Sequence, residues 1–297
     1  MIRTEPLRRS VLWAFLAVSA FAAIEPSPYE FMFAVALLAF AGGGLRFDKA
    51  MAPLILTLAV WNVGGLLALT PYVDQRDSVT FIAITIYISA TAVFFAAVVA
   101  DAPSDRMAVI RSGYMFAAVV AAVLGILGYF DVAGLGPYFT LYDNTRAMGP
   151  FKDPNVFGPF LVPPIVWLCQ DVLARRGGFM TTAAKLTVLL IGLFLSFSRG
   201  AMIDFVLSAL MLLGLTFLTA PTSKERSRTV VVALLGAILV VCLLAIILAV
   251  PSIRDMALSR ASLAQDYDTG EEGRFGNQLR AIPMLLERPF GFGPLRF

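Results

Sequence analysis

Residues Thr229–Val250, TVVVALLGAILVVCLLAIILAV, form the cleanest apolar run of this chain. A helix needs about 20 apolar residues to cross the hydrocarbon core of a bilayer, and this run supplies them. The whole chain has the same character, because 59% of its 297 residues are hydrophobic and only 14% are charged. Soluble domains carry about 25% charged residues. The sequence therefore predicts an integral membrane protein.

Eight further apolar runs bring the predicted number of membrane spans to about nine. They are Val11–Ile24, Phe31–Leu45, Ala52–Thr70, Val79–Ala100, Ser112–Phe130, Asn155–Gln170, Met180–Phe197 and Gly200–Ala220. The first run follows three arginines and also fits a signal peptide, but more spans follow at once, so we expect it to remain as an uncleaved span. Pro163-Pro164 should kink or break the run that contains it.

The loop charges predict how the spans are oriented. Most loop Lys and Arg residues fall on the side of the amino terminus, which the positive-inside rule places in the cytoplasm. We predict an all-α polytopic transmembrane helical bundle in residues 1–250 and a periplasmic segment in residues 251–297. Phe275, Leu279, Ile282 and Leu286 recur at helical spacing, so this segment should contain an amphipathic helix.

Composition excludes several classes of function. The net charge of +3 is small and spread along the chain, which argues against a nucleic-acid partner. The absence of histidine excludes acid–base catalysis and metal ligation by that residue within this sequence. Cys169 and Cys242 lie inside apolar runs, where we expect them to pack as small apolar side chains and not to form a redox pair. We predict neither a metal nor a cofactor.

A polar island, RAMGPFKDPNVFGPF at 146–160, interrupts the apolar runs. Gly149-Pro150 and Asp153-Pro154 mark turns, and Asn155 is a candidate N-cap for the next span. Arg146 and Lys152 beside a helix amino terminus would suit an anion. The alternative is an ordinary loop whose cations bind lipid headgroups.

A second island, Ser196-Phe197-Ser198-Arg199-Gly200, joins two spans with almost no loop. Arg199 must therefore lie near the membrane surface, either as a functional cation or as a snorkelling anchor. Asp204 follows within the next span, but five residues turn a helix about 140° away from the same face. A direct Arg199–Asp204 ion pair is not expected.

These islands and a third in the tail resemble, in this order, the O-antigen ligase and O-antigen polymerase family. The matching pieces are Arg146 with Gly149-Pro150-Phe151 and Asp153 to Gly158, the junction 196–200, and Gly273-Arg274 leading to Pro289-Phe290-Gly291-Phe292-Gly293. The resemblance implies a bacterial inner-membrane glycosyltransferase that works without a metal. Such enzymes transfer a glycan from undecaprenyl pyrophosphate to a glycan or a lipid A-core-like acceptor on the periplasmic face.

The resemblance also implies roles for individual residues. Arg146, Arg199 and Arg274 would be catalytic, because fixed guanidinium groups can stabilise a pyrophosphate leaving group. Lys152, Asp153, Asn155 and Arg280 would bind substrate. The family has a later His-Asn motif and further spans, whereas this sequence stops at Phe297 without a histidine. The resemblance therefore suggests a truncated chain or a base of another kind.

Two other functions remain open from the sequence. A transporter or flippase of lipid-linked sugars would also use a broken helix and charges in the membrane, but it should show two related halves. Residues 1–130 do not mirror residues 146–297. A non-catalytic membrane scaffold would not need cations on the outer side.

Overall fold

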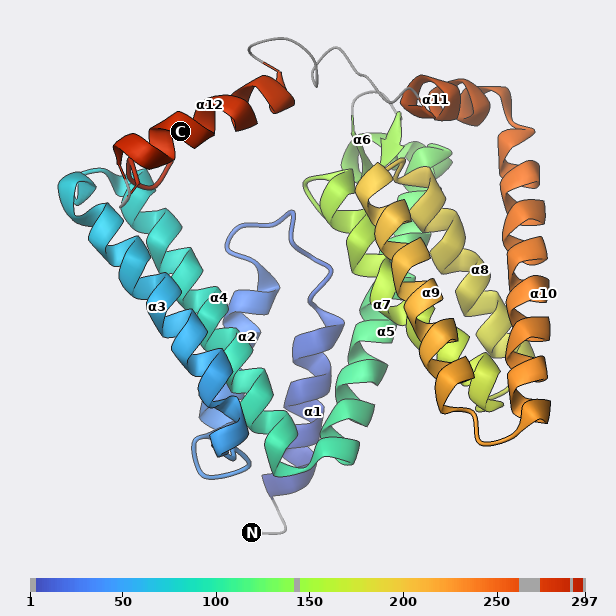
Figure 1. Ribbon diagram of the computed structural model, residues 1–297, viewed down its shortest axis with the longest axis horizontal. Helices are drawn as coiled ribbons and strands as arrows, with labels where there is room; N and C mark the ends of the chain where they lie inside the picture. The colour runs from blue at the N-terminus through green and yellow to red at the C-terminus, as the bar shows by residue number, and fades with distance from the viewer. Residues whose placement is uncertain (1–3, 142–144, 262–272, 289–290, 296–297) are drawn as a thin grey trace. The chain divides into compact units, whose positions relative to one another are not determined.

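The computed structural model describes residues 4–141, 145–261, 273–288 and 291–295 (Figure 1). The helices are α1 (Thr4–Ala17), α2 (Pro28–Phe40), η1 (Lys49–Met51), α3 (Ala52–Leu69), η2 (Thr70–Tyr72), α4 (Arg76–Asp101), α5 (Pro103–Tyr129), η3 (Val132–Gly134), α6 (Gly136–Phe139), α7 (Pro154–Ala174), α8 (Phe179–Leu195), α9 (Arg199–Thr219), α10 (Ser223–Leu248), α11 (Pro251–Ala261) and α12 (Arg274–Glu287). Two strands of two residues each, β1 (Thr140–Leu141) and β2 (Arg146–Ala147), form an antiparallel pair. The predicted all-α class is confirmed.

Six helices of the described residues are long and apolar enough to cross a membrane. These segments are Lys49–Tyr72, Arg76–Asp101, Pro103–Tyr129, Pro154–Ala174, Arg199–Thr219 and Ser223–Leu248. The helices α2 and α8 are apolar but shorter. The protein is thus a membrane protein with six candidate spans, and the topology of nine spans stays a prediction.

The chain forms two compact units. The first contains Met1–Ala36 and Val109–Ala261, and the second contains Leu37–Ala108 and Ser262–Phe297. The predicted division at residue 250 is of another kind, because it separates residues inside the membrane from residues outside it. The two compact units instead group residues that pack against one another.

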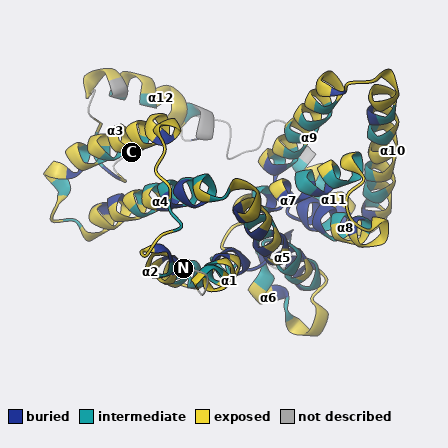
Figure 2. Cartoon of the chain, turned by 90° about the horizontal axis from the view of Figure 1, so that it is seen from below, coloured by how far each residue is buried: buried dark blue, intermediate teal, exposed yellow. Residues whose placement is uncertain are grey.

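The core of the first unit lies among α5, α7 and α8, where dark blue marks buried residues in Figure 2. Ala122 of α5 is fully buried, and the backbone of Gly192 in α8 comes close to it. Phe157 and Leu161 of α7 fill the space beside these small residues. Small residues let helix backbones approach closely, which is how helices pack inside membranes.

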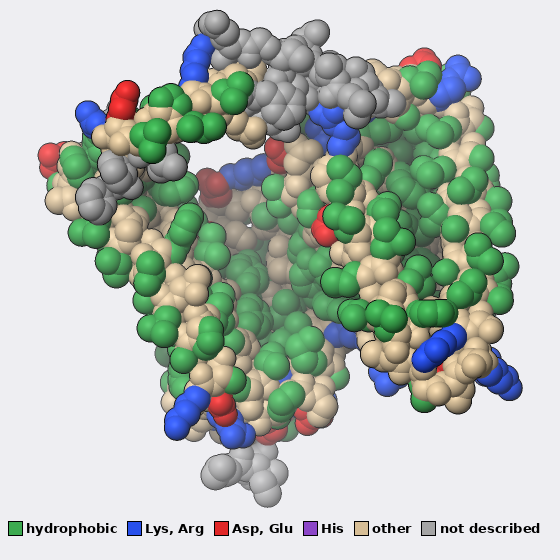
Figure 3. All heavy atoms as spheres, in the orientation of Figure 1, with side chains coloured by type: hydrophobic (Ala, Val, Ile, Leu, Met, Phe, Trp, Pro, Cys, Tyr) green, Lys and Arg blue, Asp and Glu red, His purple; other side chains and the backbone are tan. Residues whose placement is uncertain are grey.

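The outer helices have little buried surface of their own. In the most apolar 18-residue stretch of α10 no part is buried inside the protein. In the corresponding stretches of the spans that contain α3 and α9, only 6% is buried. Figure 3 shows hydrophobic side chains covering the visible faces of α9 and α10. Such surfaces are far larger than the apolar patches that soluble monomers expose, so bilayer lipid is their natural cover.

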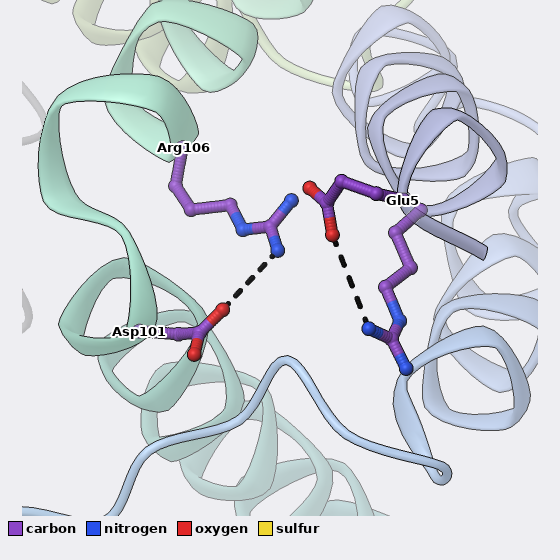
Figure 4. A network of polar contacts seen from close by, with 4 residues as sticks. Glu5, Asp101 and Arg106 are labelled. Carbon is purple, nitrogen blue, oxygen red and sulfur yellow. Dashed lines mark hydrogen bonds and ion pairs between the residues drawn. The ribbon is translucent and has the colours of Figure 1, made fainter. Parts of the chain in front are cut away.

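The second unit is organised around the pair α3 and α4. Asn62 of α3 donates from Nδ2 to Ser89 Oγ of α4 at 2.8 Å. In the first turn of α5, Arg106 is 1% exposed and pairs with Asp101 Oδ2, at the end of α4, at 3.3 Å (Figure 4). Its guanidinium carbon lies 5.3 Å from the centre of the Phe40 ring. A buried cation requires such partners, so Arg106 fixes the turn between α4 and α5.

Two predictions about helices in the first unit are wrong in detail. The helix predicted at residues 11–24 runs from Thr4 to Ala17, because the backbone N–H groups of Ala22 and Ala23 bond to the Pro150 carbonyl at 3.1 and 3.0 Å. The span with two adjacent prolines is one continuous helix, α7, so the predicted break does not occur, and the kink stays a prediction.

The continuity of α7 has a local cause. Pro164 cannot donate to the carbonyl of Phe160, which lies four residues earlier. Tyr114 of α5 donates its hydroxyl to that carbonyl at 3.0 Å. The Tyr114 ring also stacks on the Phe160 ring, with 4.5 Å between the centroids. A neighbouring helix thus replaces the missing hydrogen bond.

Candidate functional site

The first polar island begins as a hairpin strand. Arg146 in β2 pairs with Leu141 in β1, and the N–H groups of Met148 and Gly149 bond to the Phe139 carbonyl at 2.9 and 3.1 Å. Gly149 has φ +53°, and a Cβ there would lie 2.9 Å from the Ala121 carbonyl oxygen. Only glycine suits this left-handed position so close to α5. The hairpin and the turn after it hold the island against the core.

Arg146 is the residue that joins the first two islands. Its side chain is buried, with 6% of the residue exposed. Nε donates to the carbonyl of Ser196 at 2.9 Å, and one terminal nitrogen donates to Asn155 Oδ1 at 2.9 Å. Strand β2, the start of α7 and the end of α8 therefore meet at one guanidinium.

The second island is a tight turn between α8 and α9. Ser196 ends α8 and donates its hydroxyl to the Leu193 carbonyl at 2.6 Å. Phe197 has φ +47°, which is uncommon for a residue other than glycine, and its ring lies 6.2 Å from that of Tyr129. The Ser198 hydroxyl then accepts from Ala201 N and caps α9. The turn is thus fixed by hydrogen bonds and by packing.

Gly158 lets α7 approach this turn. A Cβ at Gly158 would lie 2.7 Å from Ala201 Cβ, 2.9 Å from Ser196 Oγ and 3.3 Å from Ser198 Cβ. The amino-terminal part of α7 therefore lies directly against the beginning of α9. Helix amino termini carry partial positive charge, so two such ends are concentrated here.

Arg199 is the first residue of α9 and is half-buried. Arg199 lies three residues after Ser196, whose carbonyl accepts from Arg146, so both arginines belong to the same junction. The first two islands therefore meet in the described residues. Spacing in the sequence alone gave no reason for it.

The other predicted residues of the first island have partners of their own. Asp153, not Asn155, is the N-cap of α7, and its Oδ1 accepts from Asn155 N at 2.7 Å. The predicted N-cap role of Asn155 is therefore wrong, and its side chain instead accepts from Arg146. Lys152 is exposed and forms an ion pair with Glu25, a partner that the sequence did not indicate.

Asp204 lies on α9, five residues after Arg199. Its Oδ1 accepts from Ser208 Oγ at 3.2 Å, and no cation of the described chain lies within 4.0 Å of its carboxylate. Arg199 is not among the partners that the described residues give Asp204. Both Asp204 and Ser208 line a pocket of about 310 Å³ between α7 and α9, with Pro163 and Trp167 on its other side.

Comparison with known proteins relates the carboxy-terminal part of the chain to a protein family. Residues 184–297 match the family model described as O-antigen ligase. The carboxy-terminal part of the chain is thus similar to the O-antigen ligase family. Neither the curated proteins nor the solved structures gave a match.

The O-antigen ligase match contains the turn 196–200 and Arg199, whereas Arg146 precedes it. Arg274 and Arg280 also fall within the match. Arg274 begins α12 and Arg280 is exposed on it, in the second unit. The side chain of Arg274, together with Pro289 and Phe290 of the third piece, lies outside the described residues. Their approach to Arg199 therefore stays a prediction.

The described residues contain no group of three or more Asp, Glu, Cys or His side chains that could hold a metal ion. The junction gathers guanidinium groups, hydroxyls and helix amino termini, which suit an anion, beside the Asp153 carboxylate that caps α7. A site of this kind can bind phosphate oxygens and stabilise negative charge that develops during group transfer.

Proposed function

We propose that this membrane protein transfers a glycan from undecaprenyl pyrophosphate to an acceptor sugar at the periplasmic face of the bacterial inner membrane. Its O-antigen ligase domain supports glycan transfer in general. The observation that carries the finer proposal is the junction of Arg146 with Ser196, which positions Arg199 at the beginning of α9. The polymerase reaction differs only in its acceptor.

The leaving group explains why arginine suits this position. Transfer of the glycan breaks the bond between its anomeric carbon and the phosphate oxygen, so negative charge grows on undecaprenyl pyrophosphate. In the proposed reaction Arg199 contacts that phosphate, and the amino terminus of α9 adds its partial charge. A guanidinium stays protonated under all physiological conditions and can bind two oxygens at once.

Arg146 has a different part in the proposal. Its burial and its bonds to Ser196 and Asn155 favour a role behind the surface of the site, where it holds the turn and adds positive potential. Asp153 maintains the start of α7, and Asn155 orients Arg146. Lys152 would reach the donor phosphate once it leaves Glu25.

Arg274 and Arg280 complete the proposed set on α12. Arg274 would contact the pyrophosphate from the periplasmic segment, and Arg280 would contact the sugar or the acceptor. The amino terminus in the cytoplasm and α12 in the periplasm are parts of the same proposal, supported by the distribution of loop charges.

Glycan transfer in proteoliposomes tests the proposal. Purified chain would receive undecaprenyl-pyrophosphate-linked glycan and acceptor, and labelled product would be counted for wild type, Arg199→Ala and Arg199→Lys. We expect Arg199→Ala to lower the rate about 10²-fold, as removal of one charge-stabilising donor does in other enzymes. Arg199→Lys should retain part of the rate, because it keeps the charge but loses the fork geometry.

Arg176→Ala is the matched control, since Arg176 is an exposed arginine in the connection between α7 and α8. Its rate should equal that of wild type. Equal rates for Arg199→Ala and wild type would refute the assignment of Arg199. Donor movement across the bilayer without product would favour the transporter instead.

A further inference from the structure

Helix α12 carries an uncovered apolar stripe. Leu279, Ile282 and Leu286 are 69%, 59% and 78% exposed. Their spacing of three and four residues places them on one face of the helix. Single exposed leucines are common on protein surfaces, but three large apolar side chains in a row on one short helix need a cover.

Two residues on the side of α12 away from the stripe are less exposed than the stripe itself. Ala281 and Met284 are only partly exposed, and at 100° per residue they lie roughly 130° and 170° from the centre of the stripe. Exposed Glu287 and Arg288 also lie away from the stripe. The apolar stripe is therefore not the side by which the described chain holds the helix.

The segment after α12 attaches it to the turn between α3 and α4. Ser78 Oγ, which is buried, donates to the Pro294 carbonyl at 3.2 Å. Gly293 has φ +99°, and a Cβ there would overlap the Tyr72 ring. The Gly291 N–H bonds to the Arg288 carbonyl at 2.8 Å, which joins this attachment to the end of α12.

This attachment lies at one end of two candidate membrane spans. The segment Lys49–Tyr72 ends at the turn, and the segment Arg76–Asp101 begins there. Large apolar side chains of both helices are exposed, among them Leu67 and Phe81, which lipid must cover. The carboxy-terminal end of α12 lies near the ends of α3 and α4 (Figure 1), whose apolar surfaces we expect bilayer lipid to cover.

We propose that α12 lies in the plane of the bilayer surface, with Leu279, Ile282 and Leu286 inserted among phospholipid chains. An amphipathic helix with an apolar face and a charged face binds the boundary between headgroups and acyl chains in this way. Arg288 and Glu287 then face the headgroups and water. This inference concerns the lipid contact of α12 alone and does not depend on the proposed glycan transfer.

The membrane depth of single spin labels tests this proposal. Cys169 and Cys242 would be replaced by alanine, and nitroxides attached to Leu279→Cys and Leu286→Cys in the full chain, in nanodiscs of phosphatidylcholine and phosphatidylglycerol. Glu287→Cys is the matched control, because position 287 lies off the stripe, about 100° around the helix from Leu286. Accessibility to oxygen, which concentrates in acyl chains, is compared with accessibility to a water-soluble nickel chelate.

We expect a ratio of oxygen to nickel accessibility several-fold higher at positions 279 and 286 than at 287. Equal, nickel-accessible signals at all three positions would overturn the proposal, because the stripe would then face water. Low accessibility to both reagents at 279 and 286 would also overturn it and indicate a protein cover, either the first unit or a second copy. All labels replace exposed side chains, and the nickel reading at 287 verifies that the helix is accessible.

Discussion

Arg146 Nε donates to the Ser196 carbonyl at 2.9 Å, across 50 residues of sequence. The carbonyl belongs to the last turn before α9, where a helix end would otherwise leave its acceptors unpaired. The same guanidinium binds Asn155 Oδ1, so the contact also involves the start of α7. One buried side chain thus determines how two membrane helices meet.

Replacement of Arg146 should therefore affect stability and activity together. Arg146→Ala leaves the Ser196 carbonyl without its donor, and hydrogen bonds to charged groups contribute about 1.5–3 kcal/mol each. We expect a lower unfolding temperature in detergent and loss of glycan transfer. Arg146→Lys can serve only one of the two acceptors and should be intermediate in both measurements.

Asn155→Ala is the control for Arg146, because it removes one acceptor and leaves the Ser196 contact intact. Its loss of stability should be smaller than that of Arg146→Ala. Wild-type stability and activity in Arg146→Ala would show that the junction does not depend on this residue.

Gly158 provides a steric test of the same junction. A Cβ at this position would approach Ala201 Cβ to 2.7 Å, so Gly158→Ala must push α7 away from α9. Overpacking of this kind costs about 1–3 kcal/mol. We expect a lower unfolding temperature and a reduced transfer rate.

Gly214→Ala in α9 is the matched control, since nothing lies within 4 Å of a Cβ at that position. Alanine in a helix is favoured over glycine by about 0.5–1 kcal/mol, so this variant should be neutral or slightly more stable. Equal effects of both substitutions would mean that close approach at Gly158 is not required.

Asp204 is an exposed carboxylate within a candidate span, with Ser208 as its hydrogen-bond partner. An aspartate at the centre of a membrane helix costs about 2.5–3.5 kcal/mol on insertion scales, and less near the end. We therefore expect Asp204→Leu to raise the unfolding temperature in nanodiscs, whereas Ser208→Ala should change it little. A clear fall for Asp204→Leu would reveal a stabilising partner in the membrane.

The helices were predictable because long apolar runs are a property of composition. The errors arose where tertiary contacts decide. The end of α1 depends on bonds from Ala22 and Ala23 to the Pro150 carbonyl, and the continuity of α7 depends on the Tyr114 hydroxyl. Helix α11 was not predicted, although buried Ile253 gives it a packed side. Such partners are remote in sequence and leave no local pattern.

The candidate site was predictable only through resemblance. Gly, Pro and Arg in two polar islands indicated turns and cations, but no spacing rule joins residue 146 to residue 196. The described residues show the two islands meeting where Arg146 binds the Ser196 carbonyl. The Asp153 cap was misplaced at Asn155 because both residues are good N-caps.

The ion pair of Lys152 with Glu25 predicts that replacing either residue changes KM for the donor, in opposite directions. Both side chains are exposed, and exposed pairs contribute only about 0–1 kcal/mol, so neither Lys152→Ala nor Glu25→Ala should change the unfolding temperature much. If Lys152 assists donor binding, Lys152→Ala should raise KM for the lipid-linked donor and leave kcat nearly unchanged. Glu25→Ala should lower KM, because it removes the carboxylate that competes with phosphate for the ammonium group. Steady-state rates at varied donor concentration measure both effects, and parallel changes of KM in the two variants would exclude this role for Lys152.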